Sequence, residues 1–241
     1  MLYLIGLGLN EKAISLDGLE ACKTCNKVYL ESYTTDFPYH AKRLEKLIGK
    51  KLEILSRDKV ESDFLVREAK NFDVALLVYG SPLFATTHLA LLDDCKKNNI
   101  KTEVIHNASV FEAIAETGLE LYKFGKITSM PRWSDNFKPS SFLDVVEENQ
   151  SIKAHSLILS DIGLKFEEAL KQLEAACIEK NFKLEKIIVA SCLGTKNKRF
   201  FYGTLESLKK IKGIKNPFCI IIPSKLHFLE EESLEKFSPF R

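Results

Sequence analysis

Short apolar runs alternate with amphipathic segments through the N-terminal part of the chain. The apolar runs have the length of buried strands and lie at residues 2–5, 28–31, 52–55 and 74–78. Apolar residues recur at helical spacing at residues 17–27, 39–48, 61–71 and 87–98. Asp17 followed by Glu20 is the pattern of a capping box, so we expect the first helix to begin there. A strand followed by a helix, repeated in this way, predicts a parallel sheet with helices on both faces.

A second series of strands and helices begins near residue 101. We expect strands at residues 101–105, 127–130, 156–159, 187–191 and 218–222. We expect helices at residues 109–116, 142–148, 166–179, 204–211 and 229–237. The polar stretch Cys95–Asn99 lies between the two series and is the expected joint. The sequence therefore predicts an α/β protein with two α/β domains, at residues 1–98 and 99–241.

Composition and charge exclude several classes of protein. The 241 residues are 45% hydrophobic and 28% charged, which is typical of a globular protein with a sizeable core. The formal net charge of +2 is too small to indicate a nucleic-acid or anionic-membrane partner. No apolar run approaches the roughly 20 residues that a membrane span needs. Met1–Gly6 lacks the features of a signal peptide. We therefore expect a cytoplasmic protein that binds neither nucleic acid directly nor a membrane.

The cysteines do not follow the spacing of a metal framework. The six are Cys22, Cys25, Cys95, Cys177, Cys192 and Cys219. Cys22 and Cys25 form an isolated Cys-x-x-Cys pair within the predicted helix at 17–27, where residues three apart share a face. Burial against the sheet is the preferred interpretation, with redox chemistry and metal binding as alternatives. Reduced thiols in a cytosolic protein fit all of them.

The strand at 74–78 leads into a turn that is suited to a ligand. Gly80 and Pro82 end the strand, and Thr86-Thr87 begin the next helix. A strand, a sharp turn and a helix N-terminus form the usual ligand-facing edge of an α/β sheet. The first strand ends in Gly6-Leu7-Gly8, so its backbone approaches either a ligand or a neighbouring loop, and we prefer the ligand.

Three further segments lie at the carboxyl ends of expected strands, where open α/β sheets bind ligands. They are Ile105–Ala113, the residues around Asp161, and Ile220–His227. For any one of them taken singly, an ordinary connecting turn is the simpler interpretation.

Several common chemistries lack the residues that they need. Glu11 stands where the third glycine of a dinucleotide fingerprint would fall, which argues against a nicotinamide site. No Gly-x-Ser-x-Gly elbow occurs, and Gly194-Thr195-Lys196 has no upstream glycine at the P-loop spacing. The five histidines are spread singly and predict neither a catalytic triad nor a metal site. This pattern favours a reaction driven by proximity and a reactive cofactor over one that an acid/base dyad carries out.

Short motifs in a fixed order run through nearly the whole chain. In the N-terminal part they are Leu4–Leu9, Ser32–Thr34, Leu47–Lys50, Leu83–His88 and Ile105–Ser109. In the C-terminal part they are Thr117–Leu119, Tyr122–Lys126, Ser140–Phe142, Ala154–Leu157 and Pro223–His227. In number and order they resemble the diphthine synthases, which are among the tetrapyrrole-methylase-like class III methyltransferases. The glycine-rich first strand and the Gly-x-Pro turn are also shared with corrin and sirohaem methylases.

The resemblance implies a fold, a reaction and a set of contact residues. The implied fold has two α/β domains with the cofactor in the cleft between them, in a homodimer. The implied reaction uses S-adenosyl-L-methionine to methylate translation elongation factor 2, as a step in diphthamide biosynthesis. The amino group of a 3-amino-3-carboxypropyl-histidine is methylated repeatedly. The family's cofactor contacts fall here on Leu9, Ser81, Phe84, Ser109, Val110, Ser160, Leu193 and Phe218.

Ser81 departs from the family, which usually has Asp in a Gly-Asp-Pro turn. A serine can hydrogen-bond to the cofactor, but it removes a negative charge near the sulfonium and is expected to weaken binding. Two alternatives to an active diphthine synthase stay open. One is a non-catalytic relative that binds the elongation factor, and the other is a tetrapyrrole methylase.

Overall fold

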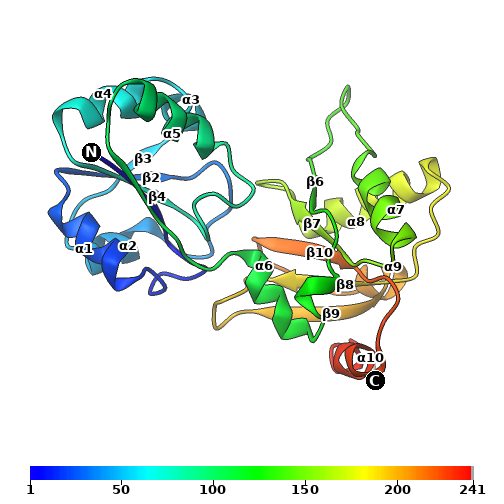
Figure 1. Ribbon diagram of the computed structural model, residues 1–241. Coiled ribbons are helices and arrows are strands. Elements are labelled where there is room, and N and C mark those ends of the chain that lie inside the picture. The colour runs from blue at the N-terminus through cyan, green and yellow to red at the C-terminus, as the bar shows by residue number, and fades with distance from the viewer. Residues whose placement is uncertain (240–241) are drawn as a thin grey trace. The chain divides into compact units, whose positions relative to one another are not determined.

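The computed structural model describes residues 1–239, which divide into two compact units (Figure 1). The first unit is Met1–Val110, and the second begins at Phe111. Each unit has one five-stranded sheet. Within the described residues, no helix combines the length and the apolar character that crossing a membrane requires.

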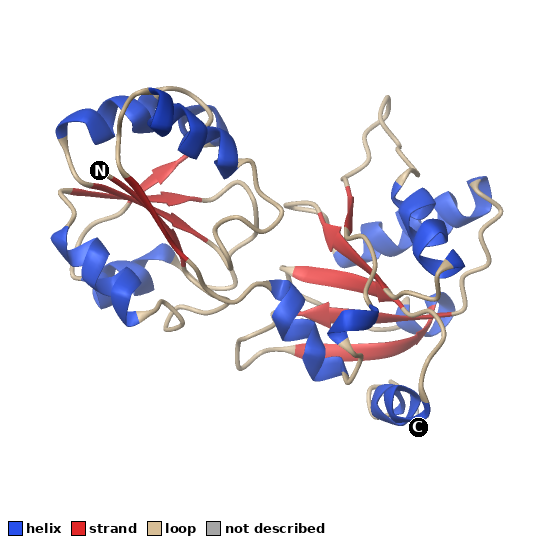
Figure 2. Cartoon of the chain, viewed as in Figure 1, coloured by secondary structure: helices blue, strands red, loops and turns tan. Residues whose placement is uncertain are grey.

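The first unit is a parallel sheet between two layers of helices, as Figure 2 shows. Its strand order is β3-β2-β4-β1-β5. The strands are β1 Leu2–Gly6, β2 Lys27–Glu31, β3 Glu53–Leu55, β4 Val74–Val78 and β5 Thr102–Ile105. The helices are α1 Leu16–Thr24, α2 Ala41–Ile48, α3 Arg57–Val60, α4 Phe64–Asn71 and α5 His88–Lys97.

The central strand β4 explains why the sequence shows a continuous apolar run. All of its residues are buried, and their side chains alternate between two cores. Leu76 packs on the side of α4 and α5, whereas Ala75 and Leu77 pack on the side of α1 and α2. A strand covered on both faces needs apolar residues at every position. The parallel sheet expected from the pattern is confirmed.

Three local expectations for the first unit differ from the structure. The helix expected at residues 61–71 is instead two helices, α3 Arg57–Val60 and α4 Phe64–Asn71. β5 pairs with β1, with Leu2 opposite Thr102, so it belongs to the first sheet and does not begin the second series. The division between the units accordingly falls after Val110 and not after residue 98. The first helix begins at Leu16, and its N-cap is Ser15, which accepts a hydrogen bond from the Gly18 amide at 3.1 Å. The expected capping box at Asp17 is therefore wrong.

The second unit is a mixed sheet with the order β6-β7-β10-β8-β9. β6 is parallel to β7, and the other neighbours are antiparallel. The strands are β6 Thr128–Met130, β7 Ser156–Ser160, β8 Lys186–Ser191, β9 Arg199–Thr204 and β10 Phe218–Ile222. The helices are α6 Val110–Ala113, α7 Phe142–Ser151, α8 Phe166–Glu179, α9 Leu205–Leu208 and α10 Phe228–Glu235, with short 3-10 turns at Ile114–Thr117 and Leu121–Lys123.

The sequence pattern misses β9. This strand pairs along its whole length with β8, from Lys186 opposite Thr204 to Ser191 opposite Arg199. It is an edge strand with only Tyr202 and Gly203 buried, so it carries no continuous apolar run. Its pairing with β8, which the local sequence does not report, makes it a strand.

A buried carboxylate fixes the last helix, α10, to the second unit. Glu230 is 1% exposed, and it accepts hydrogen bonds from the backbone amides of Glu120 at 3.1 Å and His227 at 2.8 Å. The ammonium group of Lys123 forms an ion pair with the same carboxylate. Burial by itself would raise the pKa of Glu230. The hydrogen bonds, led by the one from His227, outweigh this and lower the pKa to about 2.

His155 completes this cluster in its neutral form. Its Nδ1 accepts a hydrogen bond from the Ser224 amide at 3.0 Å, so Nε2 carries the proton and donates to Glu230 Oε1 at 3.1 Å. Burial lowers the pKa of His155, in agreement with a neutral ring. The motifs Tyr122–Lys126, Ala154–Leu157 and Pro223–His227 thus meet at one buried junction, where they support α10.

Replacing Glu230 by Gln is expected to lower the free energy of unfolding by about 3 kcal/mol near neutral pH, because Lys123 loses its buried partner. The folded pKa lies below the unfolded one, so the carboxylate stabilises the protein above about pH 4.5 and less as the pH falls toward 2. Urea denaturation of both proteins between about pH 3 and pH 7 measures this difference. The exposed Glu232→Gln on the same helix is the control. An equal loss in the control, or a difference that does not change with pH, contradicts the prediction.

Candidate functional site at the carboxyl edge of the first sheet

The topology of the first sheet singles out the carboxyl ends of β1 and β4. These strands are parallel neighbours, with Gly6 opposite Val78. The helix that follows β1 packs on one face of the sheet, and the helix that follows β4 packs on the other. Neighbouring strands whose connections leave on opposite faces form a topological switch point, where open α/β sheets bind ligands. The Gly80 turn expected to face a ligand lies at this point.

Two glycines join the loops that follow β1 and β4. The amide of Gly8 donates to the carbonyl of Gly80 at 3.1 Å, and the amide of Gly80 donates to the carbonyl of Gly8 at 3.0 Å. Both residues have left-handed backbones, with φ of 66° and 70°. A Cβ on Gly8 would lie 2.7 Å from Ala13 Cβ, and one on Gly6 would lie 2.7 Å from the Gly80 carbonyl oxygen. The close packing of this loop and of its neighbours therefore accounts for the glycines at and after the end of β1.

Asn107 ties the loop after β5 to the loop after β1. Its Nδ2 donates to the carbonyl oxygens of Gly6 at 3.1 Å and Ala13 at 2.9 Å, and its Oδ1 accepts from the Ala108 amide at 2.8 Å. Sequence reasoning assigned no role to Asn107, although it lies within a motif of the resemblance. An asparagine after a strand was the only signal, and its partners lie about 100 residues away in the chain.

The Gly80 turn is held by hydrogen bonds within itself. The Phe84 amide donates to the Ser81 carbonyl at 3.3 Å, and the Thr86 hydroxyl donates to the Pro82 carbonyl at 3.1 Å. Ala85 has a φ of 53°, in a region that costs a residue with a side chain about 1–2 kcal/mol. The turn is thus a defined structure with one strained position.

Part of the expected contact set converges at this edge. In the first unit it comprises Leu9, Ser81, Phe84, Ser109 and Val110. Leu9 and Ser109 are buried, and both approach Gly80: a Cβ placed there would lie 3.9 Å from Leu9 Cδ2 and 3.8 Å from Ser109 Cα. The set thus follows the ends of β1, β4 and β5.

The remaining expected residues lie at one end of the strands of the second sheet. The hydroxyl of Ser160, at the end of β7, donates to the carbonyl of Phe218, at the start of β10. Phe218 also pairs with Ser191 at the end of β8, shortly before Leu193. Ser160, Leu193 and Phe218 therefore lie together, because β10 runs antiparallel to both of its neighbours.

The Pro223–His227 segment lies at the opposite end of the strands of that sheet. It follows the carboxyl end of β10, and β10 is antiparallel to β7, so this end lies opposite to Ser160. The segment leads into α10, where the His227 side chain and Glu230 form a capping box. This segment and the residues around Asp161 both follow the carboxyl ends of strands, as expected. Antiparallel pairing of β7 and β10 places them at opposite ends of the sheet, so they do not form one ligand-facing edge.

The cysteines are core residues. All six are buried free thiols. Burial raises the pKa of Cys22 to about 12 and that of Cys25 to about 11, so both remain protonated and unreactive at neutral pH. The preferred interpretation, packing against the sheet, is confirmed for this pair, since both side chains belong to the core beneath α1 and α2.

Comparison with known proteins places this architecture. Residues 1–209 match the family of Tetrapyrrole (Corrin/Porphyrin) Methylases. The chain is 36% identical to the diphthine synthase of Methanocaldococcus jannaschii over 251 residues, an alignment that covers 98% of each protein. The chain belongs to the diphthine synthase family of tetrapyrrole methylases.

Other diphthine synthase relatives agree in sequence and in fold. The chain is 45% identical over 168 residues to the diphthine methyl ester synthase of Schizosaccharomyces pombe, which covers 68% of this chain and 59% of that protein. The crystal structure of a diphthine synthase with 33% identity superposes with a TM-score of 0.90, covering 98% of this chain and 95% of the other. The tetrapyrrole-methylase-like α/β fold implied by the resemblance is confirmed.

Replacing Gly8 by Ala is expected to destabilise the protein by more than replacing Gly49 by Ala. Both glycines have left-handed φ, but nothing lies within 4 Å of a Cβ at Gly49, whereas Gly8 faces Ala13 and Asn107. Gly49→Ala should therefore cost only the backbone preference, about 1 kcal/mol, and Gly8→Ala about 1–3 kcal/mol more. Thermal and urea unfolding of the two variants provide the comparison. Equal losses would show that the loops at Gly8 yield without cost.

Proposed function

We propose that this chain is an S-adenosyl-L-methionine-dependent methyltransferase of diphthamide biosynthesis. Its substrate is translation elongation factor 2, on which it repeatedly methylates the amino group of a 3-amino-3-carboxypropyl-histidine. The alignment with a diphthine synthase over 98% of both chains carries the proposal. The switch point between β1 and β4 supports it, because such points bind ligands in open α/β sheets.

The cofactor contacts belong to the same proposal. We assign them to Leu9, Ser81, Phe84, Ser109 and Val110 in the first unit, and to Ser160, Leu193 and Phe218 in the second. The first set suits S-adenosyl-L-methionine because it combines backbone groups, small side chains and one aromatic ring at a sheet edge. Assembly into a cytoplasmic homodimer completes the proposed arrangement.

The reaction asks the protein mainly to align two groups. When bound, the cofactor supplies an activated methyl group, which bonds to the amine lone pair while the carbon–sulfur bond breaks and its electron pair stays on sulfur. The amine attacks in its neutral form, and solvent takes the proton that the product ammonium releases. The chain's part is to hold the Gly8 and Gly80 loops in one geometry, which their mutual hydrogen bonds do. No catalytic base is assigned.

Incubation with S-adenosyl-L-methionine and elongation factor 2 that carries the aminocarboxypropyl group tests the function. Mass spectrometry is expected to show the modified peptide gaining successive methyl groups. An unchanged elongation factor despite cofactor binding would indicate a non-catalytic relative, and methylation of uroporphyrinogen instead would indicate a tetrapyrrole methylase. Relatives are named both diphthine synthase and diphthine methyl ester synthase, so alkaline treatment of the product should follow, since it removes an ester methyl and leaves N-methyl groups.

Replacing Ser81 by Asp is expected to tighten binding of S-adenosyl-L-methionine about tenfold. A solvent-exposed carboxylate a few ångström from a sulfonium contributes about 1 kcal/mol or slightly more to the free energy of binding. Ser81→Asn is the control, because it has the size and polarity of Asp without the charge. Isothermal titration calorimetry at low and high salt separates the two, since only the charge effect is screened. Equal affinities of the Asp and Asn variants would contradict the prediction.

A further inference from the structure

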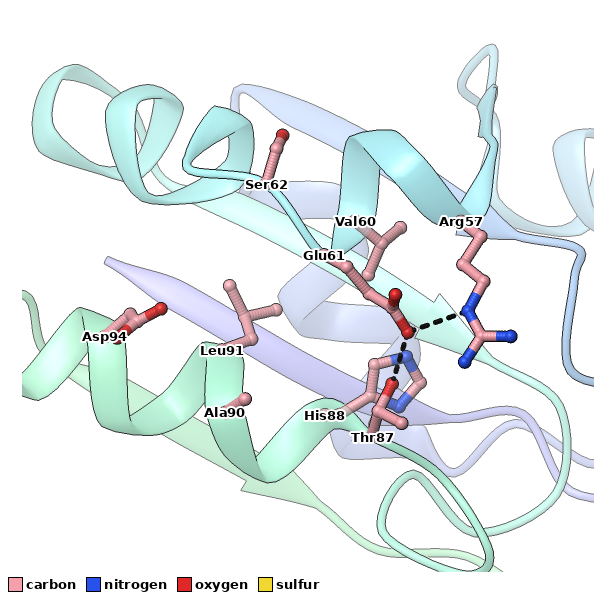
Figure 3. Close-up of a pocket in the computed structure, with 9 residues that line it drawn as sticks. All are labelled: Arg57, Val60, Glu61, Ser62, Thr87, His88, Ala90, Leu91 and Asp94. Carbon is pink, nitrogen blue, oxygen red and sulfur yellow. Dashed lines mark hydrogen bonds and ion pairs between the residues drawn. The ribbon is translucent and has the colours of Figure 1, made fainter.

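A pocket of about 380 Å³ opens in the first unit between α3 and α5 (Figure 3). Arg57 and Glu61 line it from α3 and its C-cap, and Thr87 and His88 line it from the beginning of α5. Both elements begin at the carboxyl edge of the sheet, since α3 follows β3 and α5 follows β4. Its volume is in the range of pockets that hold small ligands or single extended side chains.

Arg57 is oriented by its neighbours but keeps unused donors. Its Nε donates to Glu61 Oε1 at 2.9 Å, and the Thr87 hydroxyl donates to the same oxygen at 3.0 Å (Figure 3). The hydrogen bond from Arg57, followed by the one from Thr87, lowers the pKa of Glu61. The guanidinium carbon lies 5.9 Å from the ring centre of Tyr33. Within residues 1–239, no protein group accepts a hydrogen bond from the two terminal nitrogens of Arg57. A guanidinium fixed through Nε presents those nitrogens to a carboxylate.

The inner wall of the pocket connects with the Gly80 turn. His88 is 1% exposed, and its Nδ1 donates to the Pro82 carbonyl at 3.1 Å. Burial lowers the pKa of His88 against the opposing effect of Glu31, so the ring is neutral. Its Nε2 lies 3.5 Å from the Tyr33 hydroxyl. His88 is thus a structural residue, as its buried position requires, and it fixes the pocket relative to the turn that carries Ser81.

We propose that this pocket receives the amino-acid end of the modified histidine, with the terminal nitrogens of Arg57 binding its carboxylate. The inference rests on the proposed function, because that function defines a substrate side chain with one carboxylate and one amine. The guanidinium supplies the charge and the planar pair of donors that a carboxylate requires. One short segment then carries both the proposed cofactor contact Ser81 and the buried His88, which lines the substrate pocket and is hydrogen-bonded to Pro82.

A second arginine of the same unit provides a matched control. Arg67 pairs with Asp63 at a spacing of four residues, as Arg57 pairs with Glu61. The two arginine side chains are similarly exposed, 62% for Arg57 and 66% for Arg67. Arg67 does not line the pocket. A general effect of losing a surface arginine pair will therefore affect both variants, and a substrate contact will affect only Arg57.

The experiment compares binding of two forms of elongation factor 2, one with the aminocarboxypropyl-histidine and one with the unmodified histidine. The wild-type protein is expected to prefer the modified form. Arg57→Gln should lose about tenfold or more of that preference, and Arg57→Lys should retain part of it through charge alone. Arg67→Gln should keep the wild-type preference. Thermal unfolding checks that each variant is folded, and calorimetry with S-adenosyl-L-methionine should give the same affinity for all of them within about twofold.

Three results on substrate preference overturn the inference. These are an unchanged preference in Arg57→Gln, an equal loss in Arg67→Gln, or the absence of a preference in the wild-type protein. A parallel loss of cofactor affinity in Arg57→Gln also overturns it, because Arg57 would then support the cofactor site. Failure of the proposed function has a different signature. The wild-type protein would transfer no methyl group to the modified elongation factor, whatever the binding preference of the variants.

Discussion

The carboxyl edge of the first sheet depends on two backbone hydrogen bonds between Gly8 and Gly80. Both residues adopt the left-handed φ that glycine permits, and Gly6 leaves room for the Gly80 carbonyl, so the loops after β1 and β4 approach to backbone contact. Asn107 then adds the loop after β5 through hydrogen bonds to main-chain carbonyls. The resulting edge is built from backbone and one amide side chain. Its shape therefore does not depend on the rotamers of exposed residues, which suits a reaction whose rate depends on alignment.

The buried or capping histidines and the buried Glu230, which are residue types able to act as an acid or a base, support the fold. His155 is neutral and joins the Ser224 amide to Glu230, and His227 caps α10. His88 is likewise buried and neutral, and it holds Pro82. Burying a titratable group is stabilising only when its partners satisfy it, and the carboxylate of Glu230 shows how many hydrogen bonds this takes. With these histidines engaged in structure, a methyl transfer that needs no base agrees with what the chain offers.

The Gly80 turn links the two proposed binding functions. Its carbonyl at Pro82 accepts from both Thr86 and His88, so the turn and the beginning of α5 form one rigid piece. Ser81 lies on this piece, and so does Thr87, which lines the Arg57 pocket. A substitution that changes the backbone of the turn will therefore affect the proposed sites of the methyl donor and the methyl acceptor together. Arg57 lies outside the turn, on α3, so its substitution addresses the proposed substrate pocket alone.

The sequence by itself determined the alternation of strands and helices in the first unit and the family, but not the division of residues 57–71 into α3 and α4. The run Val74–Val78 is apolar at every position because β4 is covered on both faces, and local periodicity reports that directly. Ordered motifs along the chain carried the resemblance, and they included Leu9, Phe84 and Ser109 of the candidate site, whereas Ser81 departs from the family. Asn107 and Arg57 were not singled out, because their roles come from partners and from a pocket that other segments complete.

Only the tertiary structure decided which sheet β5 joins, that Arg199–Thr204 is a strand, and that Pro223–His227 lies at the opposite end of the strands from Ser160. The physical reason is common to all three. Pairing and direction of strands are set by hydrogen bonds between segments far apart in the chain, and these leave no period in the local sequence.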